Sequence, residues 1–328
     1  MYESFYNFSS KPFQLIPDLS CLFHSRGHDQ ALSYFNYGLE QGEGFVTITG
    51  EIGAGKTTLI QALLSELNDK DVVVATMVAA NLDAMGILSM IASVFNLPYE
   101  GHSKVSLLKT LEEHFLAYRR EGKKVLLVVD EAQTLNTDAL EELRILSNLE
   151  RDGVAVMQIF LVGQAELRAT ILSREFEHLR QRIIASYHLE PLTEQETVDY
   201  INYRLEHVGW QNDPTIASEV YVEIFRWTKG IPRRINLLCD RLFVYGFIKE
   251  THSLGKRDIE HVVSDLNKEL GGQPNEFVSG QYAAPANKPI NADVSTLEAK
   301  IDSIEAKLDK LIHAVNKRKR RKRTSERK

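Results

Sequence analysis

Eight residues near the start of the chain have the spacing of a phosphate-binding loop. Residues 50–57 read Gly-Glu-Ile-Gly-Ala-Gly-Lys-Thr, a complete G-x-x-x-x-G-K-[ST] motif. The strand-like run 45–49 precedes this loop, and residues 58–64 follow it with helical spacing. The glycines let backbone N–H groups turn inward around phosphates, and the N-terminus of the following helix favours negative charge. A glycine-rich turn without a ligand is the alternative, but the flanking strand and helix favour a nucleotide site.

Each residue of this loop can be given an expected role. Lys56 is expected to reach the terminal phosphates of ATP, and the Thr57 hydroxyl is expected to ligate Mg²⁺. The residues predicted to bind the nucleotide are Gly50, Glu51, Ile52, Gly53, Ala54, Gly55, Lys56, Thr57 and Thr58.

A second signature combines an apolar run with two acids. Residues 125–129 read Val-Leu-Leu-Val-Val and are followed directly by Asp130 and Glu131. In open α/β sheets the carboxyl ends of the strands face the ligand. Asp130 would hold Mg²⁺ through water, and Glu131 would polarise the attacking water as a general base. A strand followed by an acidic helix cap is the alternative, and the phosphate loop upstream favours the functional interpretation.

Phosphoryl transfer also needs polar and positive groups around the transferred phosphate. Gln164 ends another strand-like segment and would orient the water beside the γ-phosphate. Arg180 and Arg182, and less favourably Arg174, precede the fifth predicted strand, and Arg233 begins a helix farther along the chain. Taken alone, each arginine would more often form a surface ion pair of small energy.

The elements that would position these residues alternate along the first 190 residues. Strands separated by helices imply right-handed crossovers and a three-layer α/β core. The run 125–129 is continuously apolar, as expected of a parallel strand buried on both faces. Strands are expected at 45–49, 72–78, 125–130, 156–162 and 184–189, and helices at 83–96, 104–120 and 137–149.

From Pro191 the strand signal disappears, which predicts a second, all-helical lid domain over 191–270 after a nucleotide-binding domain over 1–190. Glu196 stands three residues after Thr193, the spacing of a helix capping box. The helices of this lid are expected at about 193–208, 215–228, 232–250 and 256–269.

The last segment of the chain changes composition three times. Residues 271–292 are poor in large apolar groups and predict a flexible linker. Residues 293–316 carry an apolar seam at alternating steps of three and four, which favours a self-associating coiled-coil helix. A single amphipathic helix packed on the body is the alternative. Residues 317–328 hold nine basic residues and one glutamate, and this tail is expected to be disordered when unbound.

Composition limits the classes of protein to which the chain can belong. Hydrophobic content of 43% and charged content of 26% in 328 residues are ordinary for a soluble globular protein. The net charge is −6, and without the tail it is near −14, so a broad basic face for nucleic acid is not expected on the body. We expect no membrane span and no signal peptide. The two cysteines fit a reducing cytoplasm, with peripheral contact at the inner membrane as a further possibility.

These motifs together resemble those of an AAA+ ATPase, and more narrowly those of the secretion-type ATPases of the ExeA or GspA family. The nearest resemblance is to the subgroup associated with the exosortase (PEP-CTERM) and exopolysaccharide locus of Gram-negative bacteria, and it covers about residues 1–268. The segments that carry it are Gly50 to Thr57, Val125 to Gln133, Gln164, Leu179 to Arg182 and Gly230 to Arg233, supported by Lys11-Pro12-Phe13, Pro17-Asp18, His28, Gly42 to Phe45, Ala185 to Leu189, Arg204 and Gly209-Trp210.

The resemblance implies further roles. Gln164 would be the first sensor, where many AAA+ proteins carry Asn, and Arg233 would be the second sensor on the lid. Arg182, or Arg180, would be the finger that reaches the nucleotide of a neighbouring subunit. The segment from Phe5 to His28 would pack near the adenine. ExeA itself resembles a longer chain with a membrane span and a peptidoglycan-binding domain, and because neither is recognisable here we expect no direct contact with the cell wall.

The resulting expectation is a cytoplasmic, Mg²⁺-dependent, homo-oligomeric ATPase that serves envelope secretion or polysaccharide export. One alternative is a DNA-linked AAA+ regulator of the transposition or helicase-loader type, whose basic tail contacts DNA. A second is a nucleotide switch or scaffold that does not hydrolyse ATP. The tail would contact anionic lipid, nucleic acid or no partner.

Overall fold

The computed structural model describes residues 1–15, 19–67, 71–151 and 154–269 of the 328. The chain separates into two units, of which the first spans residues 1–273. The predicted linker (271–292), coiled-coil helix (293–316) and basic tail (317–328) lie outside the described residues and stay predictions.

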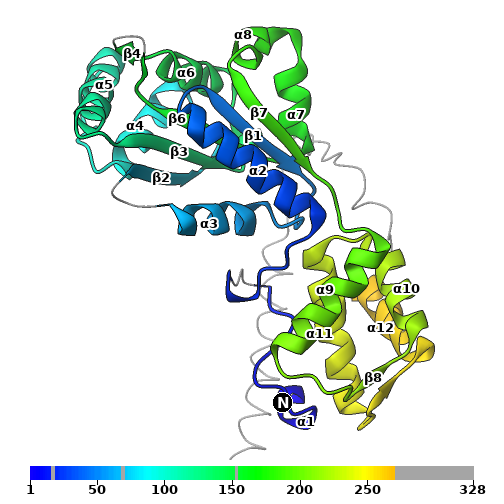
Figure 1. Ribbon diagram of the computed structural model, residues 1–328. Helices are drawn as coiled ribbons and strands as arrows, with labels where there is room; N and C mark the ends of the chain where they lie inside the picture. The colour runs from blue at the N-terminus through cyan, green and yellow to red at the C-terminus, as the bar shows by residue number, and fades with distance from the viewer. Residues whose placement is uncertain (16–18, 68–70, 152–153, 270–328) are drawn as a thin grey trace, which may run out of the picture. The chain divides into compact units, whose positions relative to one another are not determined.

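A five-stranded parallel sheet lies at the centre of the nucleotide-binding part (Figure 1). Its strand order is β2-β3-β6-β1-β7, so strands distant in the sequence are neighbours in the sheet. All four pairings are parallel, and each strand starts and ends within two residues of its expected bounds. The α/β fold class is therefore confirmed. The strands are β1 (Phe45–Gly50), β2 (Val72–Val78), β3 (Lys124–Asp130), β6 (Gln158–Gly163) and β7 (Ile183–Leu189).

Helices cover both faces of the sheet and complete three layers (Figure 1). Along β3, Leu127 and Val129 pack in the layer that contains α4 to α6, whereas Leu126 and Val128 pack against α2 and α3. Burial on both faces explains why this strand is apolar at successive positions. The helices are α2 (Arg26–Gln41) and α3 (Lys56–Glu66) on one face, and α4 (Ala84–Val94), α5 (Lys104–Arg120) and α6 (Thr137–Ser147) on the other.

Several short elements have no counterpart in the sequence-based expectations. The two-residue strands β4 (Glu150–Arg151) and β5 (Val154–Ala155) pair antiparallel, and β6 begins at Gln158, two residues later than expected. Helices α7 (Ala165–Leu172) and α8 (Glu177–Arg180) lie between β6 and β7. None of the described helices combines the length and the apolarity that a membrane crossing requires.

The lid is a helical layer with an apolar core of its own. Its first helix begins as expected, because the Thr193 side chain accepts from the Glu196 N–H while the Glu196 side chain accepts from the Thr193 N–H. Two two-residue strands, β8 (Thr215–Ile216) and β9 (Ser253–Leu254), pair in parallel and are too short to leave a sequence pattern. The lid helices are α9 (Glu194–His207), α10 (Ser218–Thr228), α11 (Pro232–Ile248) and α12 (Lys256–Glu269).

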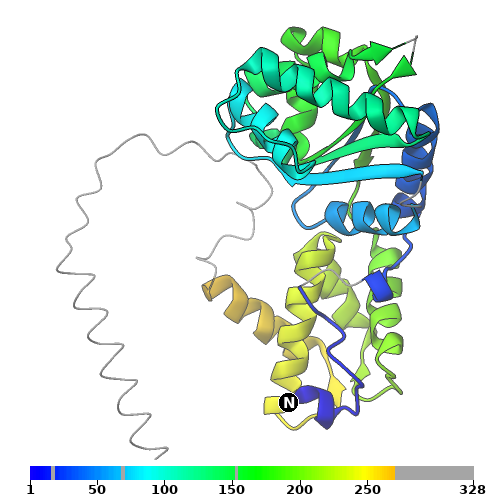
Figure 2. The same cartoon turned by 90° about the vertical axis from the view of Figure 1, so that its left-hand side faces the viewer.

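The first residues of the chain pack against the lid, although the sequence assigns them to the nucleotide-binding domain (Figure 2). Helix α1 (Tyr2–Phe5) opens this segment, and the Tyr2 hydroxyl donates to Asp240 Oδ1 at 2.8 Å. The Tyr2 and Phe13 rings stack on Phe243 of α11, with centroids 6.0 and 5.8 Å apart. The aromatic side chains cover an apolar lid surface, which no local pattern in the sequence could reveal.

Candidate functional site

Three predicted signatures meet at one edge of the sheet because of the strand order. Strand β6 lies between β1 and β3, and all three strands are parallel. The loop after Gly50, the acid Asp130 and the amide Gln164 each stand at the carboxyl end of one of these strands. The topology thus places the groups of the predicted site side by side.

The phosphate loop joins β1 to α3 and lies directly against the lid. Gly53 has φ +84° and Gly55 has φ +101°, a region that side chains rarely enter. A Cβ added to Gly53 would lie 2.5 Å from Arg233 Cβ, and the Arg233 N–H donates to the Gly53 carbonyl at 3.2 Å. The predicted second sensor therefore contacts the loop of its own chain.

Lys56 begins α3 and is 8% exposed. Its Nζ donates to the carbonyls of Gly50 and Glu51, both at 2.9 Å. Burial lowers the pKa of Lys56 from its ordinary value, against the opposing pull of Glu131 and Asp130. The ammonium group is thus held inside the loop, beside the acids of the second signature.

Thr57 and Asp130 meet across the two signatures. The Thr57 hydroxyl donates to Asp130 Oδ2 at 2.9 Å, and Asp130 Oδ1 accepts from the Glu131 N–H at 2.8 Å. A hydroxyl beside a carboxylate suits Mg²⁺, which binds through few protein oxygens and takes its other ligands from phosphates and water. No cluster of three acidic, histidine or cysteine ligands occurs among the described residues. The pair therefore fits Mg²⁺ held together with a nucleotide.

Glu131, the predicted base, lies in a network with two glutamines. Its φ of +54° is left-handed, which is uncommon outside glycine and is often found at functional sites. Glu131 Oε2 accepts from Gln133 Nε2 at 2.5 Å and from Gln164 Nε2 at 3.1 Å. The predicted base and the predicted first sensor are thus in contact. Gln133 was not predicted to have a role, although it lies only two residues after the base.

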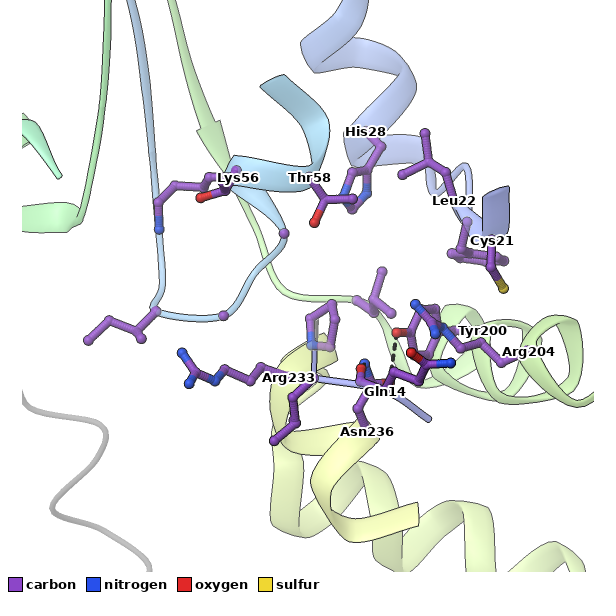
Figure 3. A pocket seen from close by; sticks show the side chains of 18 of the residues that line it. Gln14, Cys21, Leu22, His28, Lys56, Thr58, Tyr200, Arg204, Arg233 and Asn236 are labelled. Atoms are coloured by element: carbon purple, nitrogen blue, oxygen red, sulfur yellow. Dashed lines mark hydrogen bonds between the residues drawn. The ribbon is translucent and has the colours of Figure 1, made fainter. Parts of the chain in front are cut away.

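A cavity of about 330 Å³ lies between the phosphate loop and the lid (Figure 3). In Figure 3, Lys56, Thr58 and His28 lie on one side of it, opposite Arg233 and Asn236 of the lid. The predicted site residues that line the cavity are Ile52, Gly53, Gly55, Lys56, Thr57, Thr58, Glu131, Gln164 and Arg233.

The lid side of the cavity contains polar residues that were given no role from the sequence. The Tyr200 hydroxyl donates to Asn236 Oδ1 at 2.8 Å, and Asn236 Nδ2 donates to the Gln14 carbonyl at 2.9 Å. Arg204 Nη1 donates to the Pro12 carbonyl at 3.1 Å. The i, i+4 spacing of Tyr200 and Arg204 places both side chains on one face of α9, and this spacing could have identified them from the sequence as candidate cavity residues.

The segment from Phe5 to His28 divides into two parts. Gln14, Leu22 and His28 line the cavity, whereas Phe5 to Phe13 pack in the lid. The His28 Nδ1 lies 2.6 Å from Ser25 Oγ, and burial lowers the pKa of His28 from its ordinary value of 6.5. A Cβ added to Gly55 would lie 3.0 Å from His28 Nε2, so the His28 ring lies against the phosphate loop.

The two candidate finger arginines are away from this cavity. Arg182 directly precedes β7, where Nη1 donates to the Ser147 carbonyl at 2.9 Å and Nη2 lies 3.8 Å from Glu150 Oε1. Arg180 Nη1 donates to the Leu172 carbonyl at 3.1 Å. Both arginines lie near the amino end of β7, and the phosphate loop follows the carboxyl end of the adjacent, parallel β1.

Comparison with known proteins gives consistent results. A family model described as an AAA domain matches residues 39–171. The chain is 38% identical over 260 residues to general secretion pathway protein A of Aeromonas hydrophila, a match that covers 79% of this chain and 47% of that protein. The chain thus spans about half the length of this relative.

Solved structures share the fold at low identity. Cdc6p from Pyrobaculum aerophilum has a TM-score of 0.59 at 18% identity, over 83% of this chain and 74% of that one. The ADP form of the Aeropyrum pernix ORC2 protein has a TM-score of 0.54 at 20% identity, over 74% and 68%. The Thermotoga maritima RuvB branch migration motor has a TM-score of 0.52 at 18% identity, over 79% and 76%.

Proposed function

Because the chain belongs to the AAA+ ATPases of the ExeA/GspA secretion family, we propose that it binds ATP in the cavity beside Lys56 and hydrolyses it with Glu131 as general base. The observation that carries this proposal is the contact between Glu131 and Gln164 at the edge where the phosphate loop and Asp130 also lie. A base, a hydroxyl–carboxylate pair that can hold a cation, and a buried ammonium group within one cluster are the groups that phosphoryl transfer needs.

Each residue contributes a separate effect to the proposed reaction. The backbone N–H groups of the phosphate loop and the Lys56 ammonium would stabilise charge on the phosphate oxygens. Glu131 would accept a proton from water, and Gln164 would orient that water. Thr57 and Asp130 would hold Mg²⁺, which neutralises charge on the phosphates when bound. Arg233 would add positive charge from the lid of the same chain, as its contact with Gly53 supports.

Hydrolysis would require a second subunit. Strand β1 takes five residue steps from Phe45, which pairs with Ile183, to Gly50 at the loop. At 3.2–3.4 Å per residue this is a separation of about 17 Å along the sheet. Arg182 precedes Ile183 and therefore lies too far from the phosphates of its own chain. We assign it, with Arg180 as the alternative, as the finger that completes a neighbour's site in a homo-oligomer.

The biological role proposed is to power or regulate the assembly of an envelope secretion or exopolysaccharide-export system. What supports it is the identity of 38% to general secretion pathway protein A. A DNA-linked regulator is the competing role. The similarity to Cdc6p and the ORC2 protein is below 25% sequence identity, so it shows a shared fold and does not specifically support that role. Salt-sensitive DNA binding that disappears on removal of residues 317–328 would favour that competitor.

The chemistry is tested with Glu131→Gln, which keeps the size of the side chain and removes the base. We expect ATP affinity close to that of the unmodified protein and turnover about 10²–10⁴-fold lower, the usual contribution of a general base. Glu113→Gln, at an exposed position on α5, is the matched control and should hydrolyse ATP normally. Unchanged turnover in Glu131→Gln would remove this residue from the mechanism.

A further inference from the structure

Gln133 connects the two strand ends that carry the base and the first sensor. It lies in the 3₁₀ turn Ala132–Thr134, directly after Glu131. Its Nε2 donates to Glu131 Oε2 at 2.5 Å, and its Oε1 accepts from the Gln164 N–H at 3.0 Å. Both ends of one side-chain amide are therefore used, one at the end of β3 and the other at the end of β6.

The two oxygens of the Glu131 carboxylate have different surroundings. Oε2 accepts from both Gln133 and Gln164. Within the described part of the chain, no donor contacts Oε1. A carboxylate with one oxygen held in this way presents its other oxygen in a fixed direction, which a general base requires.

We infer that Gln133 is a positioning residue for hydrolysis: it fixes the Glu131 carboxylate so that Oε1 is the oxygen that takes the proton from water. This inference rests on the proposed role of Glu131. Gln133 does not line the cavity, so its effect on hydrolysis would pass through Glu131.

Gln133 is better suited to this holding role than Gln164. Its neighbour Thr134 is anchored, because its single hydroxyl proton is shared between the carbonyls of Ala79 at 3.0 Å and Glu131 at 2.9 Å. A Cβ on Gly163 would lie 2.9 Å from Gln133 Oε1, so the absence of a side chain there makes room for the amide. The side chain of Gln164 makes one longer contact, at 3.1 Å, and Gln133 would still hold Glu131 if Gln164 turned toward a bound nucleotide.

The test is a double-mutant cycle of Gln133→Leu and Glu131→Gln in the full-length protein, read as kcat and KM for ATP under single-turnover and steady-state conditions. Gln133→Leu should lower kcat about tenfold to hundredfold, less than loss of the base itself, with KM changed by less than about threefold. In the Glu131→Gln background it should change turnover by less than about twofold, because no base remains to be positioned.

Two further variants control for structural damage. Gln133→Glu keeps an acceptor for the Gln164 N–H but replaces the donor to Glu131 with a second carboxylate that repels it, so it should lose at least as much turnover as Gln133→Leu. Gln61→Leu, at an exposed position on α3, should retain normal kcat. If Gln133→Leu does not fold, Gln133→Glu carries the test alone.

The outcomes separate the inference from the function on which it rests. Normal kcat in Gln133→Leu or Gln133→Glu would overturn the inference and leave the role of Glu131 intact. Equal losses from Gln133→Leu in both backgrounds would also overturn it, because they indicate a structural effect. Normal turnover in Glu131→Gln alone would instead refute the proposed function, and the inference with it.

Discussion

The contact between the N-terminal segment and the lid gives the most direct quantitative prediction. Asn236 of α11 accepts from the Tyr200 hydroxyl at 2.8 Å and donates to the Gln14 carbonyl at 2.9 Å. Asn236 and Tyr200 are both buried, with 7% and 6% of their surface exposed. The substitution Asn236→Leu keeps the approximate volume of the side chain and removes both hydrogen bonds, so two polar groups would lose their partners.

The expected cost follows from these two groups. A buried polar group without a partner costs about 1–3 kcal/mol, and the part-buried Gln14 carbonyl adds less, so Asn236→Leu should lower the free energy of unfolding of the lid by about 1–4 kcal/mol. Tyr200→Phe alone should cost about 1–2 kcal/mol, because Asn236 then keeps its bond to Gln14. In the double variant the Tyr200–Asn236 pair is replaced by apolar groups, and the loss should be at least about 0.5 kcal/mol smaller than the sum of the single losses.

Tryptophan fluorescence during urea unfolding measures this effect in the lid alone. The chain has two tryptophans, Trp210 and Trp227, and both lie in the lid. The same proteins can be titrated with a fluorescent ATP analogue, and Asn236→Leu should bind it more weakly because Gln14 and Asn236 line the cavity. A loss of stability below about 0.5 kcal/mol for Asn236→Leu, or strictly additive losses, would refute the reasoning.

Two further predictions concern assembly and pH. Arg182→Ala should retain ATP affinity but lose turnover, and mixing it with Lys56→Ala subunits should restore part of the activity; no recovery in mixtures that co-assemble would contradict a finger acting between subunits. Burial lowers the pKa of His28 below its ordinary value of 6.5, so the unfolded chain takes up the His28 proton at a higher pH than the folded chain does. The contribution of neutral His28 to the free energy of unfolding should therefore be complete above pH 6.5 and decline as the pH falls below it. Thermal melts between pH 7.5 and 5 should show a smaller decline for His28→Gln, and an equal decline would remove His28 as a contributor.

The parallel sheet could be predicted from the sequence because each strand is marked by the residue types within it and directly after it. Strand β3 is buried on both faces, so residues 125–129 are uniformly apolar, and its end is marked by two acids. The lid helices begin at identifiable residues, such as the Thr193 cap and Pro232 at the first turn of α11. Such signals lie within a few residues of the feature that they predict.

The features that escaped prediction depend on contacts between distant residues. Tyr2 binds Asp240, and Phe13 stacks on Phe243, more than 200 positions away in the sequence. The aromatic character of the N-terminal segment was visible in the sequence, but the apolar surface that it covers forms only when α11 folds. Gln133 was missed for a similar reason, because its second partner is the backbone N–H of Gln164 on another strand.

The parallel direction of the strands places the predicted site residues and Arg182 at opposite edges of the sheet. Parallel strands place the phosphate loop, Asp130 and Gln164 together at the carboxyl edge, and the same polarity places Arg182 near the amino edge. Arg182 is also held there, by the Ser147 carbonyl and by Glu150. A rearrangement within one chain that brought Arg182 to the loop would have to break the pairing between β1 and β7. If Arg182 takes part in hydrolysis, it therefore does so across an interface. The total rate of ATP hydrolysis should then rise more steeply than linearly with protein concentration, so that turnover per subunit increases.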